Sequence, residues 1–297
     1  MRTIGARAAY YLGGPEGMAR LGFRALNYAD FASLASPLYA LDDAEARARM
    51  EAALSEIRAA GLCVNQTHGP CPTDDTTEES RARNFALTLR AIDLTAWLQA
   101  RDLVIHPILP FGQASGREDE VFDANVRWLR ALLPHAGARG VRLNVENLPY
   151  AACEISHMRT LAAVTAAVDD PACGLCLDTG HAACLGDDPA EMARLAGKRL
   201  YTLHVHDNDL RHDLHLIPFA GRIDWAAFRD ALDEIGFDGV VSLEVNLRGR
   251  VPAEMQPAVG RWLADAANYI NGTAESFTNG AATGDAAGCN TRPGISV

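Results

Sequence analysis

The sequence predicts a single (β/α)8 barrel. Short apolar runs alternate with longer amphipathic segments eight times along the chain, and this alternation is typical of a parallel sheet covered by helices. The length of 297 residues suits one barrel, because this fold usually takes about 250 residues. No Gly-rich loop of the G-x-G-x-x-G type follows the first apolar run, which disfavours a doubly wound dinucleotide-binding sheet.

The apolar runs are the expected strands. Several are rich in β-branched residues, such as Leu103-Val104-Ile105 and Val240-Val241, and such residues favour extended backbone. In chain order we expect strands at 3–10, 23–28, 62–67, 102–106, 141–146, 174–178, 200–206 and 239–245.

The amphipathic segments are the expected helices, and several have recognisable ends. Asp42, Thr77 and Asp224 stand where an N-cap is expected, since their side-chain oxygens accept hydrogen bonds from unpaired backbone N–H groups. Gly61 and Gly236 follow the last residues of two segments, as glycine commonly does at helix C-termini. In chain order we expect helices at 15–21, 42–60, 78–100, 118–138, 156–168, 188–196, 224–235 and 254–270.

Residues 1–270 form the expected barrel domain, and residues 271–297 differ from it in composition. The final segment is rich in Ala, Gly and Thr and carries too little apolar surface to fold, so we expect a disordered tail. No apolar run is long enough to span a bilayer, and the first residues lack the apolar stretch of a secretory signal. We therefore expect a cytoplasmic protein without a membrane partner.

The charge balance argues against a nucleic-acid partner. The formal net charge is −11, and phosphate binding requires clustered Lys and Arg side chains.

Metal-competent side chains recur where the expected strands end. The third to eighth strands each end in an imidazole or a carboxylate, and further groups of this kind follow in the loops. Because the C-terminal ends of barrel strands converge on one mouth, residues distant in sequence should meet there. The strand-end residues are His68, His106, Glu146, Asp178, His204 with His206, and Glu244; the loop residues are His181, Asp213 and His215.

This set predicts a divalent-metal site. A single strand-end histidine is more often a hydrogen-bonded structural residue, and a lone glutamate is more often part of an ion pair. Several buried carboxylates together are costly without positive charge, which a cation would supply. Imidazole and carboxylate ligands suit Zn²⁺, Mn²⁺, Mg²⁺ and Co²⁺, and the histidine-rich composition favours Zn²⁺ or Mn²⁺. We expect no thiolate ligand, because no cysteine belongs to the set.

Seven short motifs together resemble the xylose isomerase-like barrel superfamily, over nearly the whole chain up to about residue 265. This superfamily holds sugar isomerases and epimerases as well as endonuclease IV-type nucleases that cut abasic DNA. The motifs are His68-Gly69-Pro70, Val104-Ile105-His106-Pro107, Asn144-Val145-Glu146-Asn147, Leu177-Asp178-Thr179-Gly180-His181, Leu203-His204-Val205-His206-Asp207-Asn208, Asp213-Leu214-His215 and Leu243-Glu244-Val245-Asn246.

The isomerase and epimerase branch implies one metal and a small sugar or sugar phosphate substrate. The resemblance assigns Glu146, Asp178, His204 and Glu244 as metal ligands, with His181 touching the substrate. Glu146 and Glu244 would act as the catalytic pair that abstracts and returns a proton through an enediolate. His206 is an alternative to His204, because residues two apart on a strand face the same side. Barrels of this kind often pair, so a homodimer is also expected.

Two alternatives remain open. The nuclease branch implies three zinc ions, held by His68, His106 and Glu146, by the four residues named above, and by His181, Asp213 and His215. The acidic charge and the absence of basic, aromatic runs in the first three loops disfavour it. The other alternative is a non-catalytic sugar- or metal-binding barrel. Its support is the turn 218–221, Pro-Phe-Ala-Gly, where relatives commonly carry Pro-Gly-Glu-Gly.

Overall fold

Eight parallel strands form one sheet, in the order β7-β6-β5-β4-β3-β2-β1-β8. The computed structural model describes residues 2–7, 10–71, 75–247 and 251–272. The strands are β1 (Thr3–Arg7), β2 (Ala25–Tyr28), β3 (Cys63–His68), β4 (Asp102–Ile105), β5 (Arg142–Glu146), β6 (Cys173–Asp178), β7 (Leu200–His204) and β8 (Val240–Leu243). Each strand therefore pairs with its neighbour in the chain, as in a barrel.

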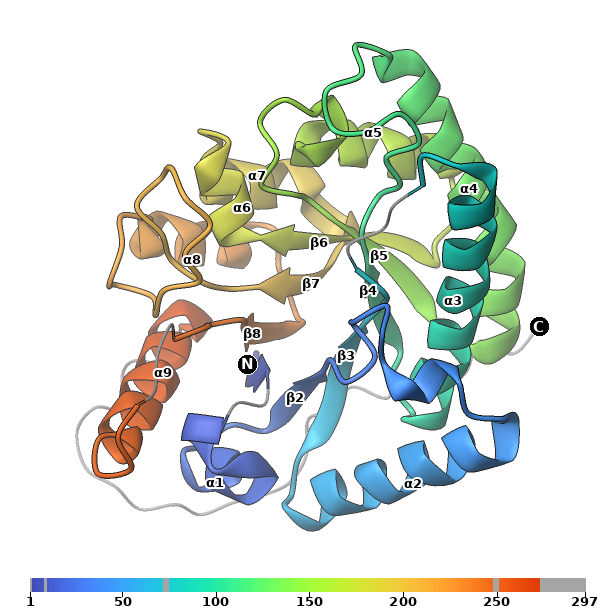
Figure 1. The fold of residues 1–297 in the computed structure, drawn as a ribbon. Coiled ribbons are helices and arrows are strands. Elements are labelled where there is room, and N and C mark those ends of the chain that lie inside the picture. The colour runs from blue at the N-terminus through green and yellow to red at the C-terminus, as the bar shows by residue number, and fades with distance from the viewer. Residues whose placement is uncertain (1, 8–9, 72–74, 248–250, 273–297) are drawn as a thin grey trace.

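The sheet closes on itself between β7 and β8. The backbone N–H of Val205 donates to the carbonyl of Ser242 over 2.9 Å, and Glu244 N–H donates to the Val205 carbonyl over 3.0 Å. Together with the β1–β8 pairing, this contact completes the ring of strands (Figure 1). The predicted (β/α)8 barrel is confirmed.

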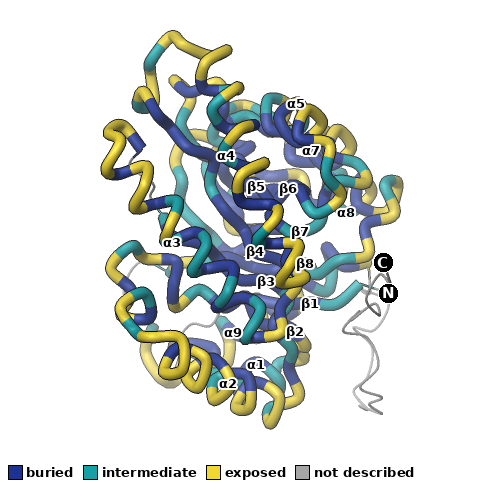
Figure 2. Tube along the Cα trace, turned by 90° about the vertical axis from the view of Figure 1, so that its right-hand side faces the viewer, coloured by how far each residue is buried: buried dark blue, intermediate teal, exposed yellow. Residues whose placement is uncertain are grey.

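Helices surround the strands on the outside (Figure 1). Their inward faces are buried and their outward faces exposed (Figure 2). The α-helices are α1 (Gly14–Arg20), α2 (Asp43–Ala59), α3 (Glu78–Trp97), α4 (Glu118–Arg139), α5 (Met158–Val168), α6 (Thr179–Cys184), α7 (Pro189–Ala196), α8 (Trp225–Glu234) and α9 (Gln256–Asn271). Short 3-10 turns are η1 (Tyr10–Leu12), η2 (Pro37–Tyr39), η3 (Glu154–Ser156) and η4 (Gly197–Arg199).

The predicted helix caps are confirmed. Asp42 accepts a hydrogen bond from Glu45 N–H at the start of α2. Thr77 and Ser80 form a reciprocal capping box on α3, and Asp224 accepts from two backbone N–H groups of α8. None of the helices in the described ranges combines the length and the apolar character that crossing a bilayer requires.

Several predicted boundaries shift. The first strand ends at Arg7, short of the predicted residue 10, and the chain turns into η1; residues 8–9 lie outside the described residues. The seventh strand ends at His204, so His206 lies beyond it. The short helix α6 was not expected. Helix α9 reaches Asn271, so the predicted tail begins one residue too early, and positions 273–297 are outside the described residues.

The barrel interior is polar where the site lies. Apolar side chains such as Met50, Ile92 and Leu129 are fully buried on the helices that cover the sheet. By contrast, strand positions along the barrel carry buried amides, among them Asn27 and Gln66. Because buried polar groups need partners, this interior favours a site over a purely apolar core.

Candidate metal centre

Four of the predicted residues meet at the C-terminal ends of the strands. Glu146, Asp178 and His204 are the last residues of β5, β6 and β7, and Glu244 directly follows β8. Each is at most 7% exposed. One ligand atom from each lies within 4.8 Å of the others. The structure thus brings together the four residues that the sequence analysis grouped as ligands of one metal.

The pKa values of the three carboxylates of this group are lowered although the side chains are buried. Burial opposes ionisation of Glu146, but the charge of His204 and hydrogen bonds from three histidines hold its pKa well below the usual range. The pKa of Glu244 is lowered in the same way, with burial opposed mainly by His204. The guanidinium of Arg7 adds a charge 3.4 Å from Glu244 Oε1. Three neighbouring carboxylates therefore require positive charge from imidazolium groups or from a cation.

Three histidines are oriented by backbone carbonyl groups. The Nδ1–H groups of His68, His181 and His215 donate to the carbonyls of Gly69, Asn147 and Glu244, each over 2.8 Å. In the neutral ring this leaves the lone pair on Nε2. Metal-binding histidines usually show the same arrangement, with the other ring nitrogen donating to a second partner.

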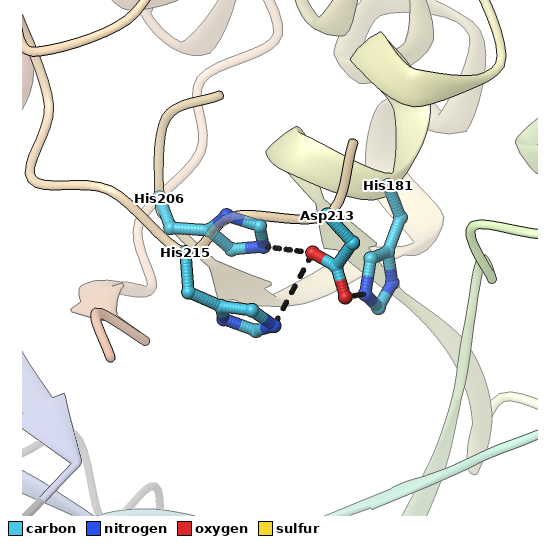
Figure 3. Close-up of side chains that lie close together, drawn as sticks. All are labelled: His181, His206, Asp213 and His215. Atoms are coloured by element: carbon cyan, nitrogen blue, oxygen red, sulfur yellow. Dashed lines mark ion pairs between the residues drawn. The ribbon is translucent and has the colours of Figure 1, made fainter. Parts of the chain in front are cut away.

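A second group consists of His181, His206, Asp213 and His215 (Figure 3). Asp213 lies between the rings, with its Oδ2 3.5 Å from His181 Nε2 and its Oδ1 3.3 Å from His215 Nε2. Burial disfavours protonation of His181 and His215, but neighbouring carboxylates raise their pKa values to about 10 and about 9. His181, Asp213 and His215 therefore form a second set of candidate ligands together with His206, which follows β7.

His204, the last residue of β7, and His206, two residues beyond it, both contact carboxylates of the site. His204 Nδ1 lies 2.7 Å from Glu146 Oε1 and 3.1 Å from Glu244 Oε2. His206 Nε2 lies 2.9 Å from Asp178 Oδ1, and its ring stacks on His215 at a centroid distance of 3.9 Å. His204 therefore belongs to the four-residue group and His206 to the second group, and Asp178 of the first group contacts His206 of the second.

A third group includes a cysteine that the sequence analysis left out. Glu146 Oε2 lies 3.2 Å from His68 Nε2 and 3.3 Å from His106 Nε2. The Cys71 sulfur lies within 4.8 Å of ligand nitrogens of these two histidines. The expectation that no thiolate serves as a ligand stays a prediction, although Cys71 lies beside two of the predicted histidines. The available signal was the position of Cys71, three residues after the strand-end His68.

A buried aspartate holds the loop that carries Asp213 and His215. Asp207 is 0% exposed and accepts hydrogen bonds from four backbone N–H groups of residues 219–223. It also accepts from Trp225 Nε1 over 2.9 Å. Phe219 adopts the left-handed region at φ 73°, a backbone conformation that favours glycine. The loop is therefore held by Asp207 although the turn lacks a glutamate.

A cavity of about 290 Å³ is lined by residues at the end of β2 and on α1 and α2, and none of the four ligand residues lines it. Its lining includes Arg7, which also contacts Glu244, and Asn27, whose Nδ2 lies 3.3 Å from His204 Nε2. Tyr28 and Asp30 continue the lining along the end of β2. Arg7 and Asn27 were not predicted, because neither position carries an imidazole or a carboxylate.

Sequence relatives match only part of the chain. An uncharacterized protein of Sinorhizobium fredii is 27% identical over 196 residues, which is 63% of each chain. Inosose isomerase of Bacillus subtilis is 27% identical over 134 residues, covering 43% of this chain and 48% of that protein. The chain thus spans less than two thirds of the length of these curated relatives.

Solved structures share the fold over nearly the whole chain. D-psicose 3-epimerase from Clostridium cellulolyticum, with D-tagatose, has a TM-score of 0.72 at 19% identity and covers 92% of this chain and 99% of its own. The IolI protein with a bound zinc atom has a TM-score of 0.70 at 17% identity, covering 93% and 100%. A model of the xylose isomerase-like TIM barrel family matches residues 16–267. This chain belongs to the xylose isomerase-like TIM barrel family.

Proposed function

We propose that this protein is a divalent-metal-dependent isomerase or epimerase of a small sugar or sugar phosphate. The observation that carries the proposal is the convergence of Glu146, Asp178, His204 and Glu244 within 4.8 Å at the barrel mouth. The partial matches to inosose isomerases and the shared fold with a sugar epimerase support the same reaction class.

The donor set of this group fits a divalent cation. It offers three buried carboxylates and one buried imidazole. Such oxygen and nitrogen ligands suit Mn²⁺ or Zn²⁺, and also Mg²⁺ or Co²⁺. Bound there, the cation would act as a Lewis acid toward the carbonyl and adjacent hydroxyl of the substrate.

Glu146 and Glu244 would carry the proton transfer. Both carboxylates have lowered pKa values, so both are available as bases. They approach the same ring of His204 from strands five and eight. One would remove the proton beside the carbonyl, and the other would return a proton to give the isomer or epimer.

Two polar side chains beside the four-residue group would contact a small sugar. Arg7 lies 3.4 Å from Glu244 Oε1, and Asn27 Nδ2 lies 3.3 Å from His204 Nε2, so substrate hydroxyl groups would find partners there.

The test is exchange of carbon-bound hydrogen. Protein loaded with Mn²⁺ or Zn²⁺ is incubated in deuterated water with ketohexoses, their phosphates and inosose, and followed by NMR. We expect deuterium at the carbon next to the carbonyl and formation of an epimer or isomer. Binding of these sugars without any exchange would instead support a non-catalytic barrel.

A second candidate is a zinc phosphodiesterase acting on abasic DNA. The observation that favours it is the presence of four groups of candidate ligands among the described residues. The net charge of −11 disfavours it. Three zinc ions per chain together with cleavage of an abasic duplex would reverse the ranking. The cytoplasmic location and the homodimer stay predictions, and size-exclusion chromatography with light scattering tests the homodimer.

A further inference from the structure

His204 is turned the opposite way from three other histidines of the site. Those three donate Nδ1–H to backbone carbonyls and keep Nε2 for the site: His68, His181 and His215. His204 instead presents Nδ1 to two glutamates, 2.7 Å from Glu146 Oε1 and 3.1 Å from Glu244 Oε2. The candidate ligand atom of His204 is therefore Nδ1, and its Nε2 needs a different partner.

The partner of His204 Nε2 is a side-chain amide on another strand. Asn27 Nδ2 lies 3.3 Å from this nitrogen, and both side chains are buried, with at most 1% exposure. The pairing of β2 with β3 shifts in register between Leu26 and Asn27, which places Asn27 opposite Gln66. Irregularities of this kind redirect side chains beside functional sites. The amide of Asn27 thus takes the place that a backbone carbonyl has beside the other three rings.

The oxygen of this amide matches what a metal-binding His204 would need. A neutral ring whose Nδ1 lone pair faces a cation carries its hydrogen on Nε2, and a buried N–H without an acceptor is costly. Asn27 Oδ1 is buried and has no hydrogen-bond partner among the described residues. A half-turn of the amide exchanges Oδ1 and Nδ2. It would bring Oδ1 to His204 Nε2 and leave Nδ2 for the substrate hydroxyl group proposed above.

We propose that Asn27 is the positioning residue of His204. Its Oδ1 accepts the Nε2–H of the ring and thereby keeps the Nδ1 lone pair directed at the four-residue group. The inference rests on the proposed function, which supplies the cation. The ring of His68 lies nearly parallel to that of His204, at 7° and 5.5 Å between centroids, but a parallel ring does not decide which nitrogen carries the hydrogen. The acceptor does.

The test is the cation affinity of variants at position 27. Asn27→Leu keeps a side chain of similar size without an acceptor, so its Kd for Mn²⁺ and Zn²⁺ should rise about 10- to 100-fold. Asn27→Asp retains an acceptor and should bind at least as tightly as wild type. The control Asn125→Leu removes a buried amide of α4 that bonds to the backbone of Ile108 and Val121, and should keep the wild-type Kd. Competition with a fluorescent chelator measures Kd, and circular dichroism checks folding.

NMR locates the hydrogen in the unaltered protein. With isotope-labelled histidine nitrogens and bound Zn²⁺, the His204 signal, identified by its loss in His204→Gln, should show one-bond coupling to hydrogen at Nε2 and none at Nδ1. Hydrogen on Nδ1 in the Zn²⁺-loaded protein, or a wild-type Kd in Asn27→Leu, overturns the proposal.

These results are separable from sugar turnover. Wild-type protein that binds Mn²⁺ or Zn²⁺ but exchanges no hydrogen in any sugar contradicts the proposed function and leaves the role of Asn27 supported by the affinity series. A wild-type protein without affinity for either cation overturns both.

Discussion

Glu146 and Glu244 contact the same nitrogen atom: His204 Nδ1 lies 2.7 Å from one carboxylate and 3.1 Å from the other. This nitrogen therefore links strand ends on β5, β7 and β8. The ring has one hydrogen to donate at this atom, so the two glutamates compete for it. A change at either glutamate should alter the electrostatic environment of the other.

The first prediction concerns the two glutamates. Glu146→Gln and Glu244→Gln should each keep the fold, because Gln has nearly the same size, and should each lower kcat by about 100-fold or more. Steady-state kinetics on a confirmed substrate, with circular dichroism as the check on folding, measures this. If both variants turn over at wild-type rates, the assignment of the catalytic pair is wrong.

The second prediction concerns metal and stability. A ligand at 100 times its Kd stabilises the folded state by about 2.7 kcal/mol, so chelation should lower Tm and Mn²⁺ or Zn²⁺ should restore it. Asp178→Asn should lose this response, because a charged ligand is gone. The control Asp187→Asn, whose carboxylate pairs with His157 away from the four-residue group, should respond like wild type. An Asp178→Asn protein with an undiminished Tm response would contradict the assignment.

The third prediction concerns the close approach of Gly180 to His206. A Cβ at position 180 would lie 2.0 Å from His206 Cε1. Gly180→Ala should therefore displace the ring and destabilise the fold by about 1–3 kcal/mol. Gly137→Ala is the control, because a Cβ there meets nothing within 4 Å and alanine favours the helix by up to about 1 kcal/mol. Urea denaturation compares them; equal stability of the two variants would refute the steric explanation.

The fourth prediction concerns Asp207. Asp207→Asn removes the charge and places an N–H₂ group against N–H donors, so it should lower the free energy of unfolding by about 3 kcal/mol. Asp209→Asn is matched to it, since Asp209 is a nearby half-buried carboxylate that accepts from the backbone N–H groups of Arg211 and His212; its cost should stay below about 1 kcal/mol. Thermal and urea unfolding measure the loss of stability in each variant. Similar losses in both variants would show that Asp207 is not the residue that holds the loop.

The sequence was sufficient for the barrel and for the residues at its mouth. Strand order follows from the repeated alternation, and Glu146, Asp178 and Glu244 could be placed because each ends or follows an apolar run. It could not be predicted which histidine belongs to which group of candidate ligands. His204 and His206 serve different groups because β7 ends between them and α6 brings His181 alongside.

The contacts of Cys71 and Asp207 could not be predicted from the sequence either. Cys71 approaches His106 only because two loops of different strands are tied together at the rim. The hydrogen-bond donors to Asp207 come mostly from residues 12 to 18 positions further along the chain. No local sequence pattern predicts these contacts. Pattern analysis identifies residue types at strand ends, whereas these contacts depend on the paths of the loops.

Closure through Val205 has a consequence for biosynthesis. The hydrogen bonds of Val205 to Ser242 and Glu244 join the seventh strand to the last one, and Glu244 is also the final ligand candidate to leave the ribosome. A nascent chain that ends before this point has an open sheet edge at β7 and an incomplete set of carboxylates. The complete four-residue group therefore forms only after residue 244 has been synthesised, and shorter products would expose that edge to aggregation or proteolysis.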